Sequence, residues 1–293
     1  MCWQELLSHQ PRLPAYPSLD QWYGALLERL QQPSPLALAI LGGRAAATPG
    51  LAFLAGYQAA LRALWPSAPW TLGALCVTEN KSLRPADMQT RLSWLHVNGR
   101  KDFVTAGDAA DWLLVVAREE GPDEDAPRVA LVVVQTSGPG VRLEQLPALP
   151  FMPDVSHARV QLESAPCERL AGDGWSDYAK PFRTIEDLHV LSAMSAWLYG
   201  VGQTCDWPQP LQLRLLALLA GCSEVSRLCA SSAATHVLLA GLFAQFEALQ
   251  VEIDAALAAG PAEWATLWSR DKTVMNVANS ARAQRLQKAL ASL

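Results

Sequence analysis

The sequence is poor in charge and in several common localisation signals. Only 17% of its 293 residues are charged, and the formal net charge of −5 is spread over both halves without a basic stripe, so there is no electrostatic footprint for nucleic acid. No apolar run reaches the roughly 18 residues that a membrane-spanning helix needs. The first residues, from Met1 to Glu5, lack the basic region and apolar core of a secretory signal. We therefore expect a cytoplasmic protein that binds neither nucleic acid nor a membrane.

Three kinds of chemical site are also missing. The six cysteines are scattered, with no Cys-x-x-Cys pair and no histidine pair at ligand spacing, so we interpret them as structural thiols and expect no metal. Residues 136–140 resemble a Gly-x-Ser-x-Gly nucleophile elbow but lack its first glycine. The stretch Leu41–Arg44, LGGR, lacks the lysine-serine ending of a phosphate-binding loop and predicts a turn.

Hydrophobic residues are plentiful, at 51% of the chain. That is rich for a soluble protein of this length, which can bury one large core or two smaller ones. Some of the apolar surface should therefore be covered by another copy of the chain. We predict a homo-oligomer.

Helical periodicity is predicted at both ends of the chain. Three prolines make residues 1–19 an irregular arm, and after Asp177 the period of 3.6 continues to the end. Thr48 is placed to cap the second helix, with Pro49 in its first turn. The predicted helices are Leu19–Leu30, Gly50–Leu64, Arg183–Val201, Pro210–Ser231, Thr235–Ala259 and Pro261–Ser292, the last possibly broken near Trp268.

Short β-like runs separated by turn signals fill the middle of the chain. These runs are Thr71–Val77, Met88–Val97, Asp102–Thr105, Trp112–Ala117, Val129–Gln135, Val141–Gln145 and Ala158–Leu162. The pattern predicts an α+β protein. We expect a helical segment over residues 1–69, a β-barrel or sandwich domain over 70–176 and a helical bundle over 177–293.

Two motifs in the β-domain are the most informative part of the sequence. Cys76–Glu79 reads CVTE, and Asn98–Thr105 reads NGRKDFVT. Together they resemble the middle domain of the acyl-CoA dehydrogenases. The resemblance implies a flavin site, with FAD as the cofactor: Val77 and Thr78 on the pyrimidine side of the ring, and Phe103 with Thr105 covering its other face.

Further segments extend the resemblance over about residues 50–225. Residues 107–118, residues 132–141 and the passage from Gly172 into the C-terminal helices follow the family in order and spacing. The resemblance implies the acyl-CoA dehydrogenase fold, with a short N-terminal helical segment and a C-terminal up-down bundle. It also implies α,β-oxidation of an acyl-CoA or related acyl thioester, with hydride transfer to flavin, as in fatty acid metabolism.

The sequence departs from the family pattern where the cofactor phosphates bind. Asn80–Asp87, NKSLRPAD, has no glycine to let a backbone approach phosphate closely. Cys205–Gln212 replaces the stretch that grips the adenosine diphosphate of a neighbouring subunit, with Trp207 in place of a phenylalanine and no arginine. About 75 residues precede Val77, so we expect a truncated N-terminal domain.

A catalytic base is expected on the first long helix of the bundle. The usual family glutamate after a Gly-Gly and Tyr stretch is missing between Gly241 and Arg270, but a minority of members place it where Glu186 lies. A poorly solvated carboxylate has the raised pKa that proton abstraction needs. Alternatively, Glu186 and Asp187 are first-turn carboxylates behind a Thr184 cap. Arg183 is then either a salt-bridge partner of Asp187 or an anchor for a substrate anion.

Two other functions remain open from the sequence. One is a flavin-dependent monooxygenase of the same superfamily. The other is a catalytically inactive member that serves as a binding or partner subunit. His189 is a weaker candidate for a proton relay. The element Trp264, Trp268, Arg270 and Asp271 predicts a buried Arg–Asp pair at a helix or subunit interface.

Overall fold

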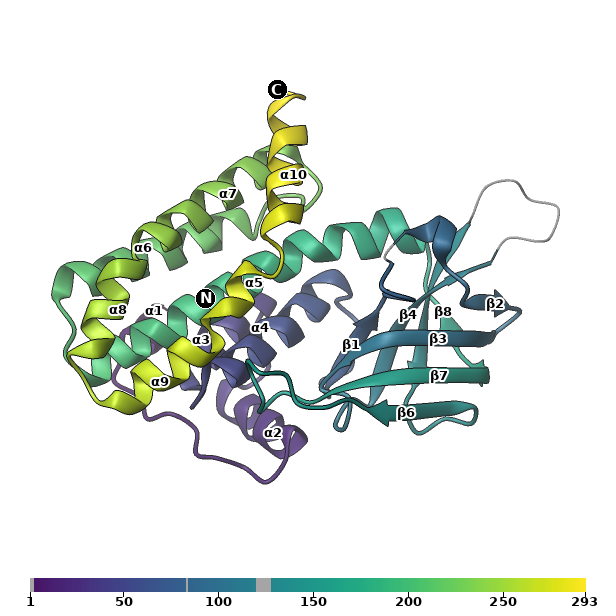
Figure 1. Cartoon of the computed structure of the whole chain (residues 1–293), viewed down its shortest axis with the longest axis horizontal. Coiled ribbons are helices and arrows are strands. Elements are labelled where there is room, and N and C mark those ends of the chain that lie inside the picture. Colours follow the sequence, from purple (N-terminus) through teal and green to yellow (C-terminus); the bar gives the residue numbers. More distant parts are fainter. Residues whose placement is uncertain (1–2, 83, 120–127) are drawn as a thin grey trace.

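A long helix joins a helical part of the molecule to a β-domain (Figure 1). The computed structural model describes residues 3–82, 84–119 and 128–293. Helix α5 (Lys180–Thr204) runs through the helical part and reaches the edge of the sheet. The order of helices, strands and helices is that of an acyl-CoA dehydrogenase fold, so the predicted α+β class is confirmed.

The four N-terminal helices are α1 (Trp3–Leu7), α2 (Leu19–Leu30), α3 (Pro35–Ala45) and α4 (Pro49–Leu64). They pack on one another and, through α3 and α4, against α5. Residues 1–19 are thus not wholly irregular, and Thr48 caps α4 as predicted, accepting a hydrogen bond from Leu51 N. The prediction of a turn at Leu41–Arg44 is wrong, because these residues lie inside α3. A Cβ atom on Gly43 would come within 2.2 Å of the Ala193 carbonyl oxygen, so glycine lets α3 approach α5 closely.

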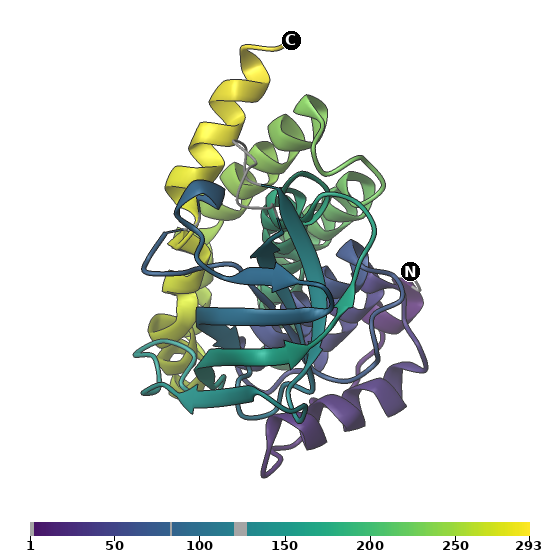
Figure 2. The ribbon, with the colours of Figure 1, turned by 90° about the vertical axis from the view of Figure 1, so that its right-hand side faces the viewer.

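The strands form one mostly antiparallel sheet, and the β-domain faces the viewer in Figure 2. Their bounds are β1 (Gly73–Cys76), β2 (Arg91–Ser93), β3 (His96–Thr105), β4 (Trp112–Arg118), β5 (Val129–Gln135), β6 (Val141–Gln145), β7 (His157–Pro166) and β8 (Glu168–Arg169). The path is β6-β7-β3-β2-β4-β5-β8, and β1 pairs in parallel with β4. The predicted strand Met88–Val97 is instead a hairpin that turns at Trp94 and Leu95.

Strands β4 and β5 are buried on both faces. On one face their side chains join a core inside the β-domain. On the other face they join a core with Tyr57 of α4 and Phe182 of α5. The second core therefore fixes the sheet against the helices that flank the candidate site.

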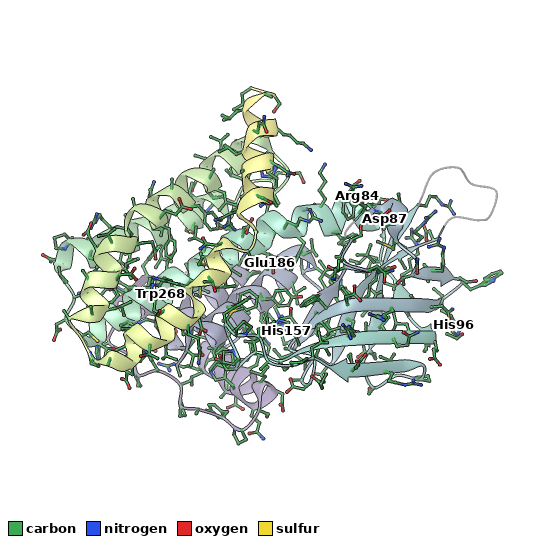
Figure 3. All side chains as sticks on the ribbon, in the orientation of Figure 1. Arg84, Asp87, His96, His157, Glu186 and Trp268 are labelled. Atoms are coloured by element: carbon green, nitrogen blue, oxygen red, sulfur yellow. The ribbon has the colours of Figure 1, made fainter. Side chains whose placement is uncertain are left out.

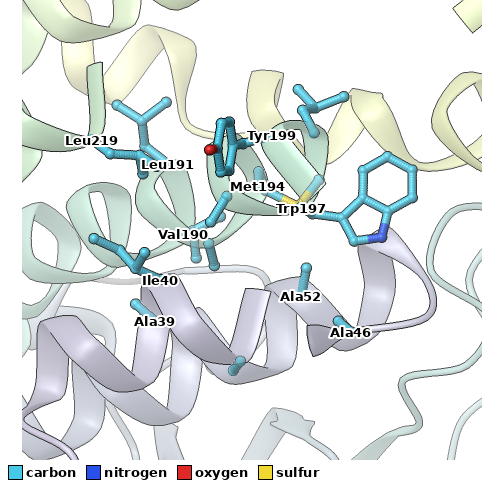
Figure 4. Close-up of a cluster of buried hydrophobic side chains, with 14 of the residues drawn as sticks. Ala39, Ile40, Ala46, Ala52, Val190, Leu191, Met194, Trp197, Tyr199 and Leu219 are labelled. Atoms are coloured by element: carbon cyan, nitrogen blue, oxygen red, sulfur yellow. The ribbon is translucent and has the colours of Figure 1, made fainter. Parts of the chain in front are cut away.

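The C-terminal helices are more broken than the sequence predicts. They are α6 (Gln209–Val225), α7 (Ala233–Ala248), α8 (Gln250–Ala258), α9 (Ala262–Asp271) and α10 (Asn279–Leu290). The expected helix Thr235–Ala259 divides at Leu249, and a short 3₁₀ turn, Lys272–Asn276, separates α9 from α10. Buried side chains of α3, α4 and α5 form the main helical core (Figure 4).

One segment of the described chain passes the length and hydropathy test for a membrane span. It is Ala233–Ala258, which comprises α7 and α8, and one third of its most apolar window is buried. A core helix of a soluble protein passes the same test, so this is weak support for a membrane segment.

Candidate functional site

The two sequence motifs meet at the end of β1. Asp102 N donates a hydrogen bond of 2.9 Å to Thr78 O, which holds Val77 and Thr78 beside the C-terminal half of β3. Thr78 and Thr105 are partly buried, whereas Phe103 is 49% exposed. The Phe103 ring meets His157 edge-on, with 6.1 Å between the ring centroids. An aromatic surface and two hydroxyl side chains thus lie on adjoining segments.

Tyr57 joins this strand end to α4. Its phenol oxygen accepts a hydrogen bond of 2.9 Å from Leu75 N. Burial raises the pKa of the Tyr57 phenol, the charge of Glu186 raises it further, and the hydrogen bond from Leu75 N opposes the rise. Tyr57 therefore lies between the strand motifs and α5. The sequence signals only that Tyr57 lies in an apolar helix, so its position was missed.

A buried ion pair supports the motifs from behind. Lys101 Nζ lies 2.5 Å from Glu79 Oε1, and the Lys101 side chain is fully buried. Glu79 also accepts hydrogen bonds from Gln89 N and Thr90 N. Burial alone would raise the pKa of Glu79, but the charge and hydrogen bond of Lys101 hold it below its ordinary value. Sequence analysis missed this pair, because the residues beside Lys101 in β3 are partly or fully exposed and give no signal that the lysine is buried.

The turn that follows Glu79 is built from its own side chains. Asn80 and Lys81 have φ values of 48° and 61°, as a two-residue type I′ turn requires. Ser82 Oγ donates to Asp87 Oδ2 at 2.7 Å and accepts from Arg84 N. The Ser82 hydroxyl is therefore already hydrogen-bonded within the turn (Arg84 and Asp87 are labelled in Figure 3). Leu83 lies outside the described residues.

Glu186 lies where the helices meet the sheet (Figure 3). Helix α5 begins at Lys180 after a π-helical turn, Gly174–Ala179, whose cap is Asp173. Glu186 is therefore not a first-turn carboxylate and Thr184 is buried within the helix, so that alternative is wrong. Burial and the neighbouring charge of Asp187 raise the pKa of Glu186 to about 8. Among the described residues, none makes a hydrogen bond or ion pair with its carboxyl group within the usual distances.

Asp187 is held by α10 and not by Arg183. Its Oδ1 accepts from Arg282 Nη1 at 2.8 Å, and its Oδ2 accepts from Arg285. Arg183 instead lies over the Trp175 ring, 5.5 Å from the centroid. The predicted salt bridge between Arg183 and Asp187 is thus wrong.

His189 does not form a relay with Glu186. Its Nδ1 lies 2.7 Å from Ile185 O within α5. Burial lowers the pKa of His189 to about 4, so the ring is a neutral, packed side chain at neutral pH.

The predicted Arg–Asp pair near the C-terminus is present within the chain. Arg270 Nε lies 2.7 Å from Asp271 Oδ1, and Asp271 Oδ1 also accepts from Met152 N. Trp268, labelled in Figure 3, is buried and stacks on Trp197. This network fixes the segment before β7 to α9. We therefore assign these residues a structural role and not a catalytic one.

The second region of departure from the family contains a cavity. The turn after α5 and the facing side of α8 enclose about 400 Å³, lined mainly by apolar groups and by Cys205, Asp206, Trp207 and Glu252. Trp207 is buried, and its Nε1 has no hydrogen-bond partner in the part of the chain that is described. No arginine lines this cavity.

The ring half of a flavin fits the residues present better than the phosphate half. Thr78, Phe103 and Thr105 offer hydroxyl groups and an aromatic face on adjoining strand ends, where backbone geometry already holds them together. By contrast, Ser82 is committed to Asp87, and Asn80 and Lys81 stand where a phosphate turn would have glycine. These residues can hold an isoalloxazine ring, and the site of the phosphates differs from the family pattern.

Known proteins share both the β-domain and the fold. The family model described as "Acyl-CoA dehydrogenase, middle domain" matches residues 74–165. No curated protein matches. Three similar solved structures are those of FkbI, described as acting in biosynthesis of a methoxymalonyl extender unit, of PigA in complex with FAD, and of butyryl-CoA dehydrogenase from Megasphaera elsdenii.

The likeness to these structures is one of fold. FkbI is 18% identical, with 93% of this chain and 96% of FkbI covered and a TM-score of 0.60. PigA is 14% identical, with 94% and 90% covered and a TM-score of 0.61. Butyryl-CoA dehydrogenase is 11% identical, with 96% and 100% covered and a TM-score of 0.61. The family-model match thus covers the β-domain, and over the rest of the chain the likeness to acyl-CoA dehydrogenase structures is one of fold.

Proposed function

We propose that the protein is an FAD-dependent oxidoreductase that oxidises an acyl thioester or a related acyl substrate at its α and β carbons. The observation that carries the proposal is the state of Glu186. Its carboxyl group is partly buried, lacks a hydrogen-bond partner among the described residues and has a pKa raised to about 8. A carboxyl group whose pKa lies near the working pH is suited to general-base catalysis.

The candidate site residues have two roles, binding of the flavin ring and removal of a substrate proton. When bound, flavin supplies the hydride acceptor. Val77, Thr78, Phe103 and Thr105 would hold its ring, because they lie together on adjoining strand ends. Glu186 would remove the α-proton of the substrate, since it lies near Tyr57 on the helix that faces these strand ends. Burial in this position keeps the carboxyl group poorly solvated, which raises its basicity.

The test is Glu186→Gln in flavin-loaded protein, with Glu144→Gln on exposed strand β6 as the matched control. Flavin reduction by an acyl thioester should slow by at least about 100-fold in Glu186→Gln, as is typical of a lost general base. Flavin content should be unchanged, and Glu144→Gln should behave as the unaltered protein. Full reduction activity in a folded, flavin-loaded Glu186→Gln protein would remove Glu186 as the base.

The second candidate function is a catalytically inactive binding subunit. The self-contained turn at Ser82 and the lack of an arginine around Trp207 favour it, because both change regions that hold the cofactor phosphates in the family. Purified protein distinguishes the two functions. A yellow protein whose flavin bands bleach with an acyl thioester is the oxidoreductase, and a colourless protein that does not take up FAD is the binding subunit.

We also propose that the protein is a homo-oligomer. Helices α6, α7 and α8 expose Leu213 at 56%, Leu238 at 48% and Val251 at 81%. Helices α7 and α8 are apolar, but only one third of their most apolar window is buried within a single chain. We therefore expect a second copy of the chain to cover them. Light scattering at micromolar concentration should give at least a dimer. A monomer would contradict the proposal.

A further inference from the structure

Arg44, in the last turn of α3, is buried without a charged partner. The residue is 4% exposed, and its Nε donates a hydrogen bond of 2.8 Å to Gln203 Oε1. A guanidinium carries five N–H donors, and within the described chain the other donors of Arg44 have no acceptor; its Nη2 is buried and unpaired. The negative end of the α3 dipole offsets part of the charge. Buried charges are normally paired, so Arg44 lacks the acceptor that its burial requires.

Two glycines make room for this arginine between α3 and α5. A Cβ atom on Gly200 of α5 would come within 2.7 Å of Arg44 Cδ and 3.1 Å of its Nε. Gly43, which precedes Arg44, lets the two helices approach closely, as described above. The LGGR sequence, which lacks the features of a phosphate-binding loop, thus places a cation at the interface of two helices.

Two further arginines, Arg12 and Arg29, lie close to Arg44. Burial and the nearby charge of Arg44 lower the pKa of Arg12 to about 9. Burial likewise lowers the pKa of Arg44, and the charge of Arg29 lowers it further. The acceptors that bond to these three arginines in the described residues are all neutral: Ala46 O, Trp197 O, Pro11 O, Gln10 Oε1 and Gln203 Oε1. Like charges held together in a partly buried place repel each other unless an anion joins them.

A small cavity adjoins two of these arginines. Arg44 of α3 and Arg29 of α2 line it, together with Gln10 of the N-terminal arm, Glu5 of α1 and apolar groups. Its volume of about 10 Å³ is room for one particle of the size of a water molecule. Glu5 is partly exposed and forms no ion pair with either arginine in the part of the chain that is described. Two guanidinium groups and one carboxylate leave the lining with a net positive charge.

We propose that this cavity binds one monatomic anion, chloride, between Arg44 and Arg29. A halide accepts N–H donors from any direction, and a single one matches the small volume of the cavity. Phosphate and sulfate are too large for this volume. A water molecule fits, but it brings no charge and leaves the repulsion among the arginines in place. The anion joins α2 and α3 to the N-terminal arm, so the site is structural and independent of the proposed oxidation.

The first experiment measures anion binding through thermal unfolding. Sodium chloride should raise the melting temperature in a saturable way relative to sodium gluconate at equal ionic strength, because an anion that binds only the folded state stabilises it. Sodium bromide should act as chloride does. Arg44→Gln should weaken the apparent chloride affinity at least about 10-fold, as loss of a charged hydrogen-bonding partner does. Arg142→Gln, on exposed β6, is the matched control. An equal response of the unaltered protein to chloride and gluconate overturns the inference.

A second variant separates a bound anion from an internal ion pair. Glu5→Gln removes the one negative charge that lines the cavity, so chloride should bind this variant more tightly than the unaltered protein. If Glu5 instead turns inward in solution to neutralise Arg44, Glu5→Gln should lower the melting temperature in gluconate and create a chloride response that the unaltered protein lacks. That result overturns the inference.

The third experiment locates the anion directly and does not depend on whether Arg44→Gln folds. Crystals of the unaltered protein grown in sodium bromide should show an anomalous-scattering peak in contact with the Arg44 guanidinium. A water molecule at this place, with no bromide peak, overturns the inference.

Discussion

Two glutamates in this protein, one buried and one partly buried, have opposite surroundings. Glu79, after β1, is paired with Lys101 and accepts two backbone hydrogen bonds. Glu186, on α5, has arginines nearby but no bonded partner in the described chain, and its pKa rises to about 8 where that of Glu79 falls. Hydrogen bonds and a contacting cation stabilise the charged form, whereas burial alone opposes it.

The different surroundings suit Glu79 to a structural role and Glu186 to proton transfer. The pKa of Glu79 is held below its ordinary value, and its carboxylate accepts hydrogen bonds from Lys101 Nζ and Gln89 N. Glu186 can gain and lose a proton near neutrality, which is the property that proton abstraction requires. The first glutamate thus supports the two sequence motifs, and the second is the base that we propose beside them.

The largest expected effect comes from breaking the structural pair. Lys101→Met leaves the Glu79 carboxylate buried without its partner, so the free energy of unfolding should fall by about 3–5 kcal/mol. Urea denaturation followed by circular dichroism measures this. In the double variant Lys101→Met with Glu79→Gln, most of the loss should be recovered. Equal instability of the single and double variants would mean that packing of the lysine stem, and not the charge, dominates.

The sequence predicted the fold class but not the contacts that surround the two glutamates. Short strand runs were sufficient for the α+β fold, and the motifs around Thr78 and Thr105 do lie together, whereas their role in holding a flavin ring stays a prediction. The pairing of Glu79 with Lys101 was missed, because it depends on a contact between two strands. The pairing of Asp187 was assigned to Arg183, the nearest cation in sequence, whereas the true partners come from α10 nearly 100 residues away. A sequence pattern shows the local periodicity of helices and strands. It does not show which residues far apart in the chain form an ion pair.

The next effect concerns the reactive glutamate and pH. The folded pKa of Glu186, about 8, exceeds its ordinary value of 4.5. As pH rises from 4.5 to 8, the unfolded chain loses this proton while the folded chain keeps it, so Glu186 lowers the free energy of unfolding over that window. Glu186→Gln should match the unaltered protein near pH 4.5 and be more stable near pH 8.5, by on the order of 1–3 kcal/mol.

Thermal unfolding of both proteins across this pH range provides the measurement. Only the difference between them matters, since other groups titrate in both. Parallel curves from pH 4.5 to 8.5 would show that Glu186 is solvated in the folded protein, and the contrast with Glu79 would then disappear.

A smaller effect is expected at the aromatic face of the ring site. Phe103→Ala removes a half-exposed ring beside His157, and loss of stacking should weaken flavin binding by about 1 kcal/mol, or about five-fold in Kd. Trp94→Ala is the matched control, since Trp94 is 92% exposed at the far turn of the same hairpin. Flavin titration followed by fluorescence quenching should separate the two variants. An equal loss in both would place the flavin elsewhere.

The smallest expected effect tests whether Tyr57 links the two glutamate regions. Thr105→Val keeps the shape of the side chain but removes the hydroxyl near the Tyr57 phenol, at a cost of about 0.5–1 kcal/mol in the free energy of unfolding. Tyr57 would still accept from Leu75 N, so the fold should persist. Since the phenol lies near Glu186, the pH at which flavin reduction is half-maximal should shift in Thr105→Val, while the stability contributed by the Glu79–Lys101 pair stays the same. A shift in neither quantity would show that the strand end and α5 act independently, and that Tyr57 is only a packing residue between them.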